Sequence, residues 1–186
     1  MKNSFLIVLC FALSACSHVN VQRDYDTHYD FSRIRLYSLE QQTAHSEDAR
    51  KVDNDLLERR IATAIRNNLA AKEFSEVTTG SNILVRYGHY LQTVIQSDPV
   101  NTHIGYGWGR RGNYGGIGVN SGYSVEQYEK SLVVIDVVDT KSGNLVWRGK
   151  GSRRVLNSQD DPQKNEQAVN ETVFEILKNF PPQKIE

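Results

Sequence analysis

The segment 131-SLVVIDVVDTKSGNLVWRGKG-151 decides the fold of this chain. Residues 133–138 are apolar on both faces except at Asp136, which is the pattern of a central strand buried on two sides. Thr140 to Asn144 are turn formers that include a glycine, and the alternation resumes with Leu145 and Trp147. The segment therefore predicts a β-hairpin with one central strand.

Four more stretches fit strands. They are residues 19–24, residues 34–39, a long strand over 82–95 that alternates along one core face, and a shorter piece from Glu76 that turns back onto it at Gly80 and Ser81. In the long strand His89 lies on the apolar face, where a hydrogen-bonded core histidine is expected.

Apolar residues recur at helical spacing in two segments, from Asp53 to about Lys72 and from Asp161 to Phe180. Two helices are too few to cover every crossover of a parallel sheet. We therefore expect an α+β domain over residues 21–182: a largely antiparallel sheet of about six strands with two helices packed on one face, followed by a tail at 183–186.

The chain opens with a positive residue, a short apolar run and small residues, which predicts a cleaved signal peptide over residues 1–15. Leu13, Ser14, Ala15 and Cys16 resemble the lipobox of bacterial lipoproteins. The resemblance implies that the mature chain begins at Cys16 with fatty chains, palmitate among them, and that residues 16–20 form a short tether. Ser17 implies sorting to the outer membrane, on its periplasmic face. The alternative is an ordinary secretory signal that ends in cysteine.

Composition excludes several classes of function. The two cysteines are Cys10 and Cys16, so the exported domain has no thiol for a disulfide, a zinc site or a nucleophile. The 22 basic and 22 acidic residues balance, which disfavours a nucleic-acid binder. The histidines show no metal-binding spacing, and no motif of a catalytic nucleophile is present. We expect no cofactor, no metal and no catalytic residue.

The tract 105-GYGWGRRGNYGGIGVNSGY-123 contains GxGxxG, the fingerprint of dinucleotide-binding loops. Such a loop must open a helix, whereas the next segment here is the valine-rich strand, so no nucleotide is expected. The tract is predicted to form a hairpin loop over 98–122. It is either an unconstrained surface loop or a contact surface for a glycan, a lipid headgroup or an envelope protein, with Trp108, Arg110, Arg111 and Tyr114 as the contacts.

A second candidate contact is electrostatic. Arg148, Lys150 and Arg154 share the polar face of the last strand, and Arg86 projects from the same side of a neighbouring one. This row is either a solvated sheet face or a site for the phosphate of anionic lipid or lipopolysaccharide. Asp136 interrupts an apolar strand, so it pairs with an arginine, caps backbone at a strand edge, or has a shifted pKa and a role of its own.

Several segments, in order along the chain, resemble the bacterial lipoproteins of the domain of unknown function 4136 family. They are 19-VNVQRDYDTHYDFSRIRLYSL-39, 56-LLERRIATAIRNNLAAKEF-74, the glycine tract, 132-LVVIDVVDTKSGNLVWRGKG-151 and the closing helix with its FPP end. Asp30-Phe31-Ser32 and Trp147-Arg148-Gly149 are the most specific pieces, while Leu36-Tyr37-Ser38 departs from the family pattern.

The resemblance implies an envelope location and an α+β domain, and it brings no catalytic residues. The first functional hypothesis is a non-enzymatic outer-membrane lipoprotein that binds or scaffolds an envelope component, held to the membrane by the lipid on Cys16. The alternative is a hydrolase of cell-wall or envelope material with an active site that the sequence does not reveal.

Overall fold

A computed structural model describes residues 19–42, 50–51, 54–98, 105–107, 114–116, 124–155 and 161–183. The predicted signal peptide over residues 1–15, Cys16, Trp108, Arg110 and Arg111 lie outside the described residues, and Tyr114 is described only in its backbone.

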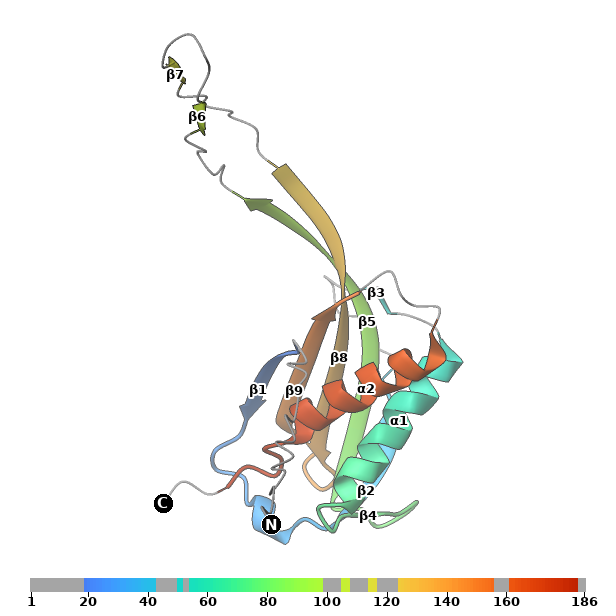
Figure 1. Ribbon diagram of the computed structural model, residues 1–186. Helices are drawn as coiled ribbons and strands as arrows, with labels where there is room; N and C mark the ends of the chain where they lie inside the picture. Colours follow the sequence, from blue (N-terminus) through green and yellow to red (C-terminus); the bar gives the residue numbers. More distant parts are fainter. Residues whose placement is uncertain are drawn as a thin grey trace, which may run out of the picture.

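The main sheet of the described residues has seven strands: six follow in the order β1-β9-β8-β5-β2-β4, and β3 pairs with β5 off this path (Figure 1). The strands are β1 (Asn20–Tyr25), β2 (Leu36–Gln41), β3 (Arg50–Lys51), β4 (Ser75–Glu76), β5 (Ile83–Asp98), β8 (Ser124–Asp139) and β9 (Leu145–Arg154). A separate pair consists of β6 (Gly105–Gly107) and β7 (Tyr114–Gly116). The hairpin of β8 and β9 stands near the centre of the sheet.

The sheet is mixed, so the expectation of a largely antiparallel sheet is wrong on this point. β1, β9, β8 and β5 pair antiparallel, but β2 pairs parallel to both β5 and β4. The reason is that helix α1 (Asp55–Ala70) carries the chain from β2 back to the start of β5, which makes the two strands run the same way. The residues before Gly80 also form no hairpin with β5, because Ser75 pairs with Leu36 of β2.

Helices α1 and α2 (Pro162–Leu177) cover the same face of the sheet (Figure 1). Each begins at a capping residue: the Asn54 side chain accepts a hydrogen bond from the amide of Leu57, and Asp161 accepts from two amides of the first turn of α2. The fold is therefore α+β with two helices on one face, and the 3-10 turn η1 (Phe31–Arg33) closes the end of the sheet opposite the β5–β8 extension.

The core lies between the helices and the sheet. Trp147 is 1% exposed and packs edge-on against Phe180, whose ring also contacts Phe31 and Phe74. Gly149 leaves room for this packing, because a Cβ there would lie 2.6 Å from Cγ2 of Ile176. The Trp-Arg-Gly piece of the family pattern thus has a packing role at two of its three positions.

Strands β5 and β8 are longer than the sheet that they belong to. They pair without interruption from Ile83 and Asp139 to Asp98 and Ser124, whereas β9 stops at Arg154, opposite Lys130. Beyond that row, residues 93–98 and 124–129 form a two-stranded extension, here called the arm (Figure 1).

Candidate functional site

Charged side chains of alternating sign form a row across the sheet face that the helices leave open. Strand register places Asp24 of β1, Arg148 of β9, Asp136 of β8, Arg86 of β5 and Glu40 of β2 side by side. Opposite charges at directly facing positions stabilise a sheet. Within the row, ion pairs join β9 to β8 through Arg148 and Asp136 and β5 to β2 through Arg86 and Glu40.

The pair at the centre of this row is the most buried. Arg148 donates two hydrogen bonds to Asp136, from Nε to Oδ1 at 2.6 Å and from Nη2 to Oδ2 at 2.7 Å. The Asp136 side chain is 4% exposed and that of Arg148 is 39% exposed. The hydrogen bonds to Asp136 raise the pKa of Arg148. Arg86 is engaged in the same way by Glu40, with Nε 2.9 Å from Oε2.

Lys150 and Arg154 follow Arg148 on the same open face of β9. The Arg154 guanidinium lies 4.4 Å from the centroid of the Tyr128 ring, and the Lys130 ammonium lies 5.6 Å from the same ring. Because Arg148 is held by Asp136, the cationic part of this face lies toward the arm and is built around Tyr128.

His89 is buried in the strand face that packs under the helices. Its Nε2 lies 2.8 Å from the Ser131 hydroxyl, and burial lowers the pKa of the ring to about 4. The histidine is therefore neutral at physiological pH, as a core residue should be. Within the described ranges no cluster of three or more His, Cys, Asp or Glu residues has the geometry of a metal site.

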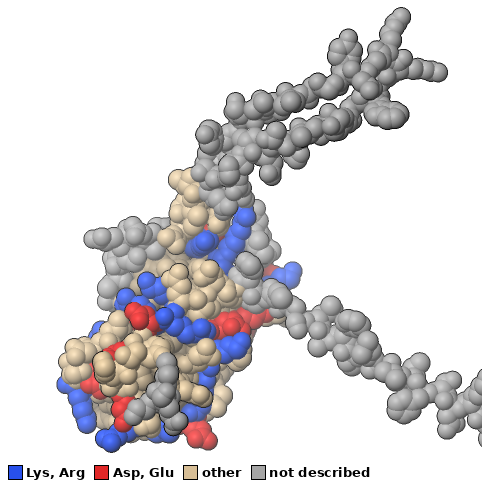
Figure 2. Space-filling model, turned by 90° about the vertical axis from the view of Figure 1, so that its left-hand side faces the viewer, with Lys and Arg blue, Asp and Glu red and all other residues tan. Residues whose placement is uncertain are grey.

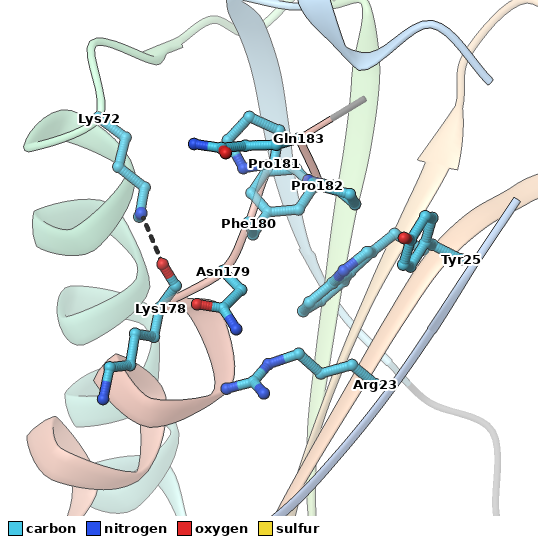
Figure 3. Close-up of a pocket in the computed structure, with 10 residues that line it drawn as sticks. Arg23, Tyr25, Lys72, Lys178, Asn179, Phe180, Pro181, Pro182 and Gln183 are labelled. Carbon is cyan, nitrogen blue, oxygen red and sulfur yellow. Dashed lines mark hydrogen bonds between the residues drawn. The ribbon is translucent and has the colours of Figure 1, made fainter. Parts of the chain in front are cut away.

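Two adjoining depressions open at the end of the domain opposite the arm, on either side of the C-terminal segment 181–183. The first has a volume of about 670 Å³. As Figure 3 shows, Arg23 and Tyr25 reach it from β1, Lys72 from the end of α1 and Lys178 from the end of α2.

The three cations of this depression surround the C-terminus of α2. Arg23 donates from Nε to the carbonyl of Ile176 at 2.9 Å and from Nη2 to that of Glu175, and Lys72 donates to the carbonyl of Lys178 at 3.2 Å. The last carbonyls of a helix have no intrahelical donors and carry partial negative charge, so cations here stabilise the helix end. They also leave the rim of the depression basic.

The second depression has a volume of about 660 Å³ and is lined mainly by residues 25–32. Its carboxylates shape the chain: Asp26 accepts from the amide of His28, and Asp30 accepts from the amide and the hydroxyl of Ser32. The Asp-Phe-Ser piece of the family pattern is thus a capped turn that presents Phe31 to the core.

Tyr29, which also lines the second depression, is held by a long-range hydrogen bond. Its hydroxyl donates to Oδ1 of Asp139 at 3.0 Å, and burial, followed by this hydrogen bond and the nearby carboxylate charge, raises its pKa to about 12. The bond ties the wall of the depression to the end of β8.

None of the residues that line the two depressions was singled out from the sequence as a contact. They come from the two ends of the described chain, from the end of α1 and, through Trp147, from β9, so no local motif joins them. On the face shown in Figure 2, basic and acidic side chains are interspersed over the described surface, with basic ones near the base of the arm.

Among the described residues no helix is long and apolar enough to span a bilayer.

Solved structures resemble this chain in fold alone. A PDZ domain protein from Parabacteroides distasonis aligns with a TM-score of 0.52 and 15% identity, over 90% of this chain and 37% of that one, so the chain spans little more than a third of its length. The PelC dodecamer from Paraburkholderia phytofirmans aligns with a TM-score of 0.41 and 10% identity over 86% and 94% of the two chains. A minor lipoprotein from Acinetobacter baumannii aligns with a TM-score of 0.37 and 12% identity over 78% and 91%.

Sequence comparison gives a more definite result. A comparison with curated proteins finds no match. A comparison with protein families matches residues 21–182 to one family, which covers all of the elements described above. The chain therefore belongs to the family described as Domain of unknown function (DUF4136).

Proposed function

We propose that the protein is a lipid-anchored lipoprotein of the bacterial outer membrane that faces the periplasm and serves as a non-catalytic binding or scaffolding module of the cell envelope. The lipobox-like Leu13 to Cys16 supports the anchor, and two or more fatty chains hold a protein stably in a bilayer.

One observation carries the non-catalytic part of the proposal. The two ionisable side chains that lie within apolar strand faces are each engaged in holding the fold together: Asp136 by Arg148, and His89 by Ser131 and by burial. A carboxylate held by two charge-assisted hydrogen bonds, or a histidine shielded from solvent, is poorly placed to exchange protons with a substrate.

The binding face of the proposal is the pair of depressions. Asn20 starts β1 at the end of the sheet near the arm, and Tyr25 ends it beside both depressions. A chain tethered through Cys16 and entering the sheet at Asn20 would hold the depressions on the side away from the membrane. The basic rim of the first depression and its tyrosine and proline walls suit a partner with acidic groups.

The anchor is tested by labelling cells with radioactive palmitate. The parent chain should take up label and fractionate with outer membranes, and Cys16→Ala should lose both because no other residue carries the lipid. Label retained in Cys16→Ala would contradict the proposed anchor.

The binding face is tested by a photocrosslinking amino acid at Thr27 or Gln183, which line the second depression. Either position should give a discrete crosslinked species in intact cells. The matched control is Lys164, which is exposed on the first turn of α2. Equal crosslinking at all three positions, or none at any of them, would argue against a partner at this end.

A hydrolase is the second candidate, and Asp26 and Asp30 in one depression are the feature that favours it. Because both carboxylates accept hydrogen bonds that build the turn, we expect no release of dye from labelled peptidoglycan by the purified protein. Release that disappears in Asp26→Asn would support the hydrolase and overturn the non-catalytic proposal.

A further inference from the structure

The arm leaves the sheet at the end where the chain enters it. Asn20 pairs with Ser152, Ser152 with Leu132, and Leu132 with Tyr90, so these residues form one row across four strands. The sheet narrows to the arm only two residues further along, after Lys130. Any attachment N-terminal to Asn20 is therefore close to the base of the arm.

We propose that the arm, residues 93–98 and 124–129, is a second membrane contact and lies in the headgroup layer of the leaflet that holds the lipid of Cys16. This inference rests on the lipid anchor of the proposed function. The occupant of the arm surface is thus a lipid bilayer, and the domain is held to it at two points.

The lengths of the tether and the arm support this contact. From Cys16 to Asn20 there are four residue steps, which reach at most about 14 Å when fully extended. From Lys130 to Ser124 there are six steps of a strand, which rise about 20 Å. An arm that is longer than the tether and starts at the same end is long enough to reach the bilayer surface while the lipid is inserted.

The side chains of the arm suit that layer. Val94 faces Tyr128 on one face of the arm, and Ile95, which is 68% exposed, lies on the opposite face. Arg154 and Lys130 lie over the Tyr128 ring at the base of the arm. A tyrosine flanked by cations is the combination found at membrane interfaces, where the ring lies among headgroups and the cations meet phosphate.

The arm has little cover from the rest of the domain beyond the amide of Val155, which donates to the carbonyl of Glu129 at 2.9 Å. Past Lys130 no strand of the described chain pairs with its outer edges, and two-stranded ribbons alone are marginally stable in water. Contact with a bilayer surface would bury part of its apolar area. Glu129, which faces Thr93 on the other side of the arm, remains hydrated in the headgroup layer.

Single-cysteine labelling tests the contact in the full lipidated chain. Cys10 belongs to the signal peptide and Cys16 carries the lipid, so an added cysteine is the sole reactive thiol. Val94→Cys and Gln127→Cys place an environment-sensitive fluorophore on the two faces of the arm, the first on the face that carries Tyr128 and the second on the face that carries Ile95. Lys141→Cys, in the turn between β8 and β9 at the opposite end of the sheet, is the matched control.

The labelled proteins are reconstituted into vesicles of phosphatidylethanolamine with a minority of phosphatidylglycerol, with and without lipids that carry a quencher on the headgroup. Both arm labels should lose most of their emission to the quencher, and the Lys141→Cys label should keep it. Two positions are used so that a local disturbance at one of them does not decide the result.

The outcomes separate this inference from the proposed function. Arm labels that are no more quenched than the control, in a chain that takes up palmitate and floats with vesicles, would overturn the membrane contact alone. Arm labels that are shielded from water but not quenched, with crosslinks between copies, would also overturn it in favour of a protein contact. A chain that takes up no palmitate overturns both proposals.

Discussion

Replacing Arg148 by alanine should destabilise the domain far more than replacing the other arginine of the charged row. The change removes two hydrogen bonds, at 2.6 and 2.7 Å, from a carboxylate whose side chain is only 4% exposed. Removing one partner of a buried ion pair costs about 3–5 kcal/mol, and removing one of an exposed pair costs about 1 kcal/mol or less. Because Arg148 is itself 39% exposed, water screens part of the loss, and we expect about 3 kcal/mol.

The control is Arg86→Ala on the neighbouring strand. Arg86 and its partner Glu40 are 42% and 54% exposed, so this change should cost below about 1 kcal/mol. A third variant combines Asp136→Val with Arg148→Met and removes both charges. Since apolar residues often replace a buried pair without loss, this variant should unfold within about 1 kcal/mol of the parent.

Urea unfolding followed by far-ultraviolet circular dichroism measures the three free energies of unfolding. If Arg148→Ala and Arg86→Ala cost the same, the open sheet face gives water free access to Asp136 and the reasoning from burial fails. If the doubly substituted variant is as unstable as Arg148→Ala alone, the loss comes from missing contacts of the side chains and not from an unpaired charge.

Three further predictions follow from single positions. Burial lowers the pKa of His89 from 6.5 to about 4, so between these pH values the unfolded chain binds a proton that the folded chain does not. The free energy of unfolding should therefore fall by up to about 3 kcal/mol as the pH drops from 6.5 to 4. In His89→Gln the free energy of unfolding should depend less steeply on pH over this range. Gly149→Ala would place a methyl 2.6 Å from Cγ2 of Ile176, so overpacking should lower the free energy of unfolding by about 1–3 kcal/mol. An unchanged midpoint of urea unfolding would show that α2, which carries Ile176, shifts freely. Asn54→Ala removes the cap that accepts from Leu57 and should cost about 1 kcal/mol, whereas Asn54→Asp should keep it.

Local patterns in the sequence predicted most of the elements. The alternation of the long strand correctly placed Ile83 and Val85 in the core, and the spacing of α2 correctly placed Val173 and Ile176. These assignments hold because side-chain direction repeats every 2 residues in a strand and every 3.6 in a helix, whatever the element packs against. Asp136 was expected to pair with an arginine, to cap backbone at a strand edge or to have a role of its own, and the structure shows the pairing.

Strand pairing could not be obtained in this way. The residues of β2 show which face is apolar, but nothing in them states that the neighbour is β5, that α1 connects the two, or that the pair is parallel. The same limit applies to the depressions, where Arg23, Lys72 and Lys178 come from three elements and meet only because α2 ends beside β1. A sequence pattern indicates whether each residue is buried or exposed. Strand pairing and cavities depend in addition on which distant segments pack against one another.

The sequence by itself indicates the local elements of the fold: the strand and helix periods, and a strand where a dinucleotide-binding loop would open a helix. It also contains the lipobox-like start from which the anchor is proposed. Folding in three dimensions adds the mixed order of the sheet, the row of alternating charges, and the placement of Asn20 at the end from which the arm projects. The physical reason is that periodicity arises from the local backbone, while register and juxtaposition arise from packing between segments far apart in the chain.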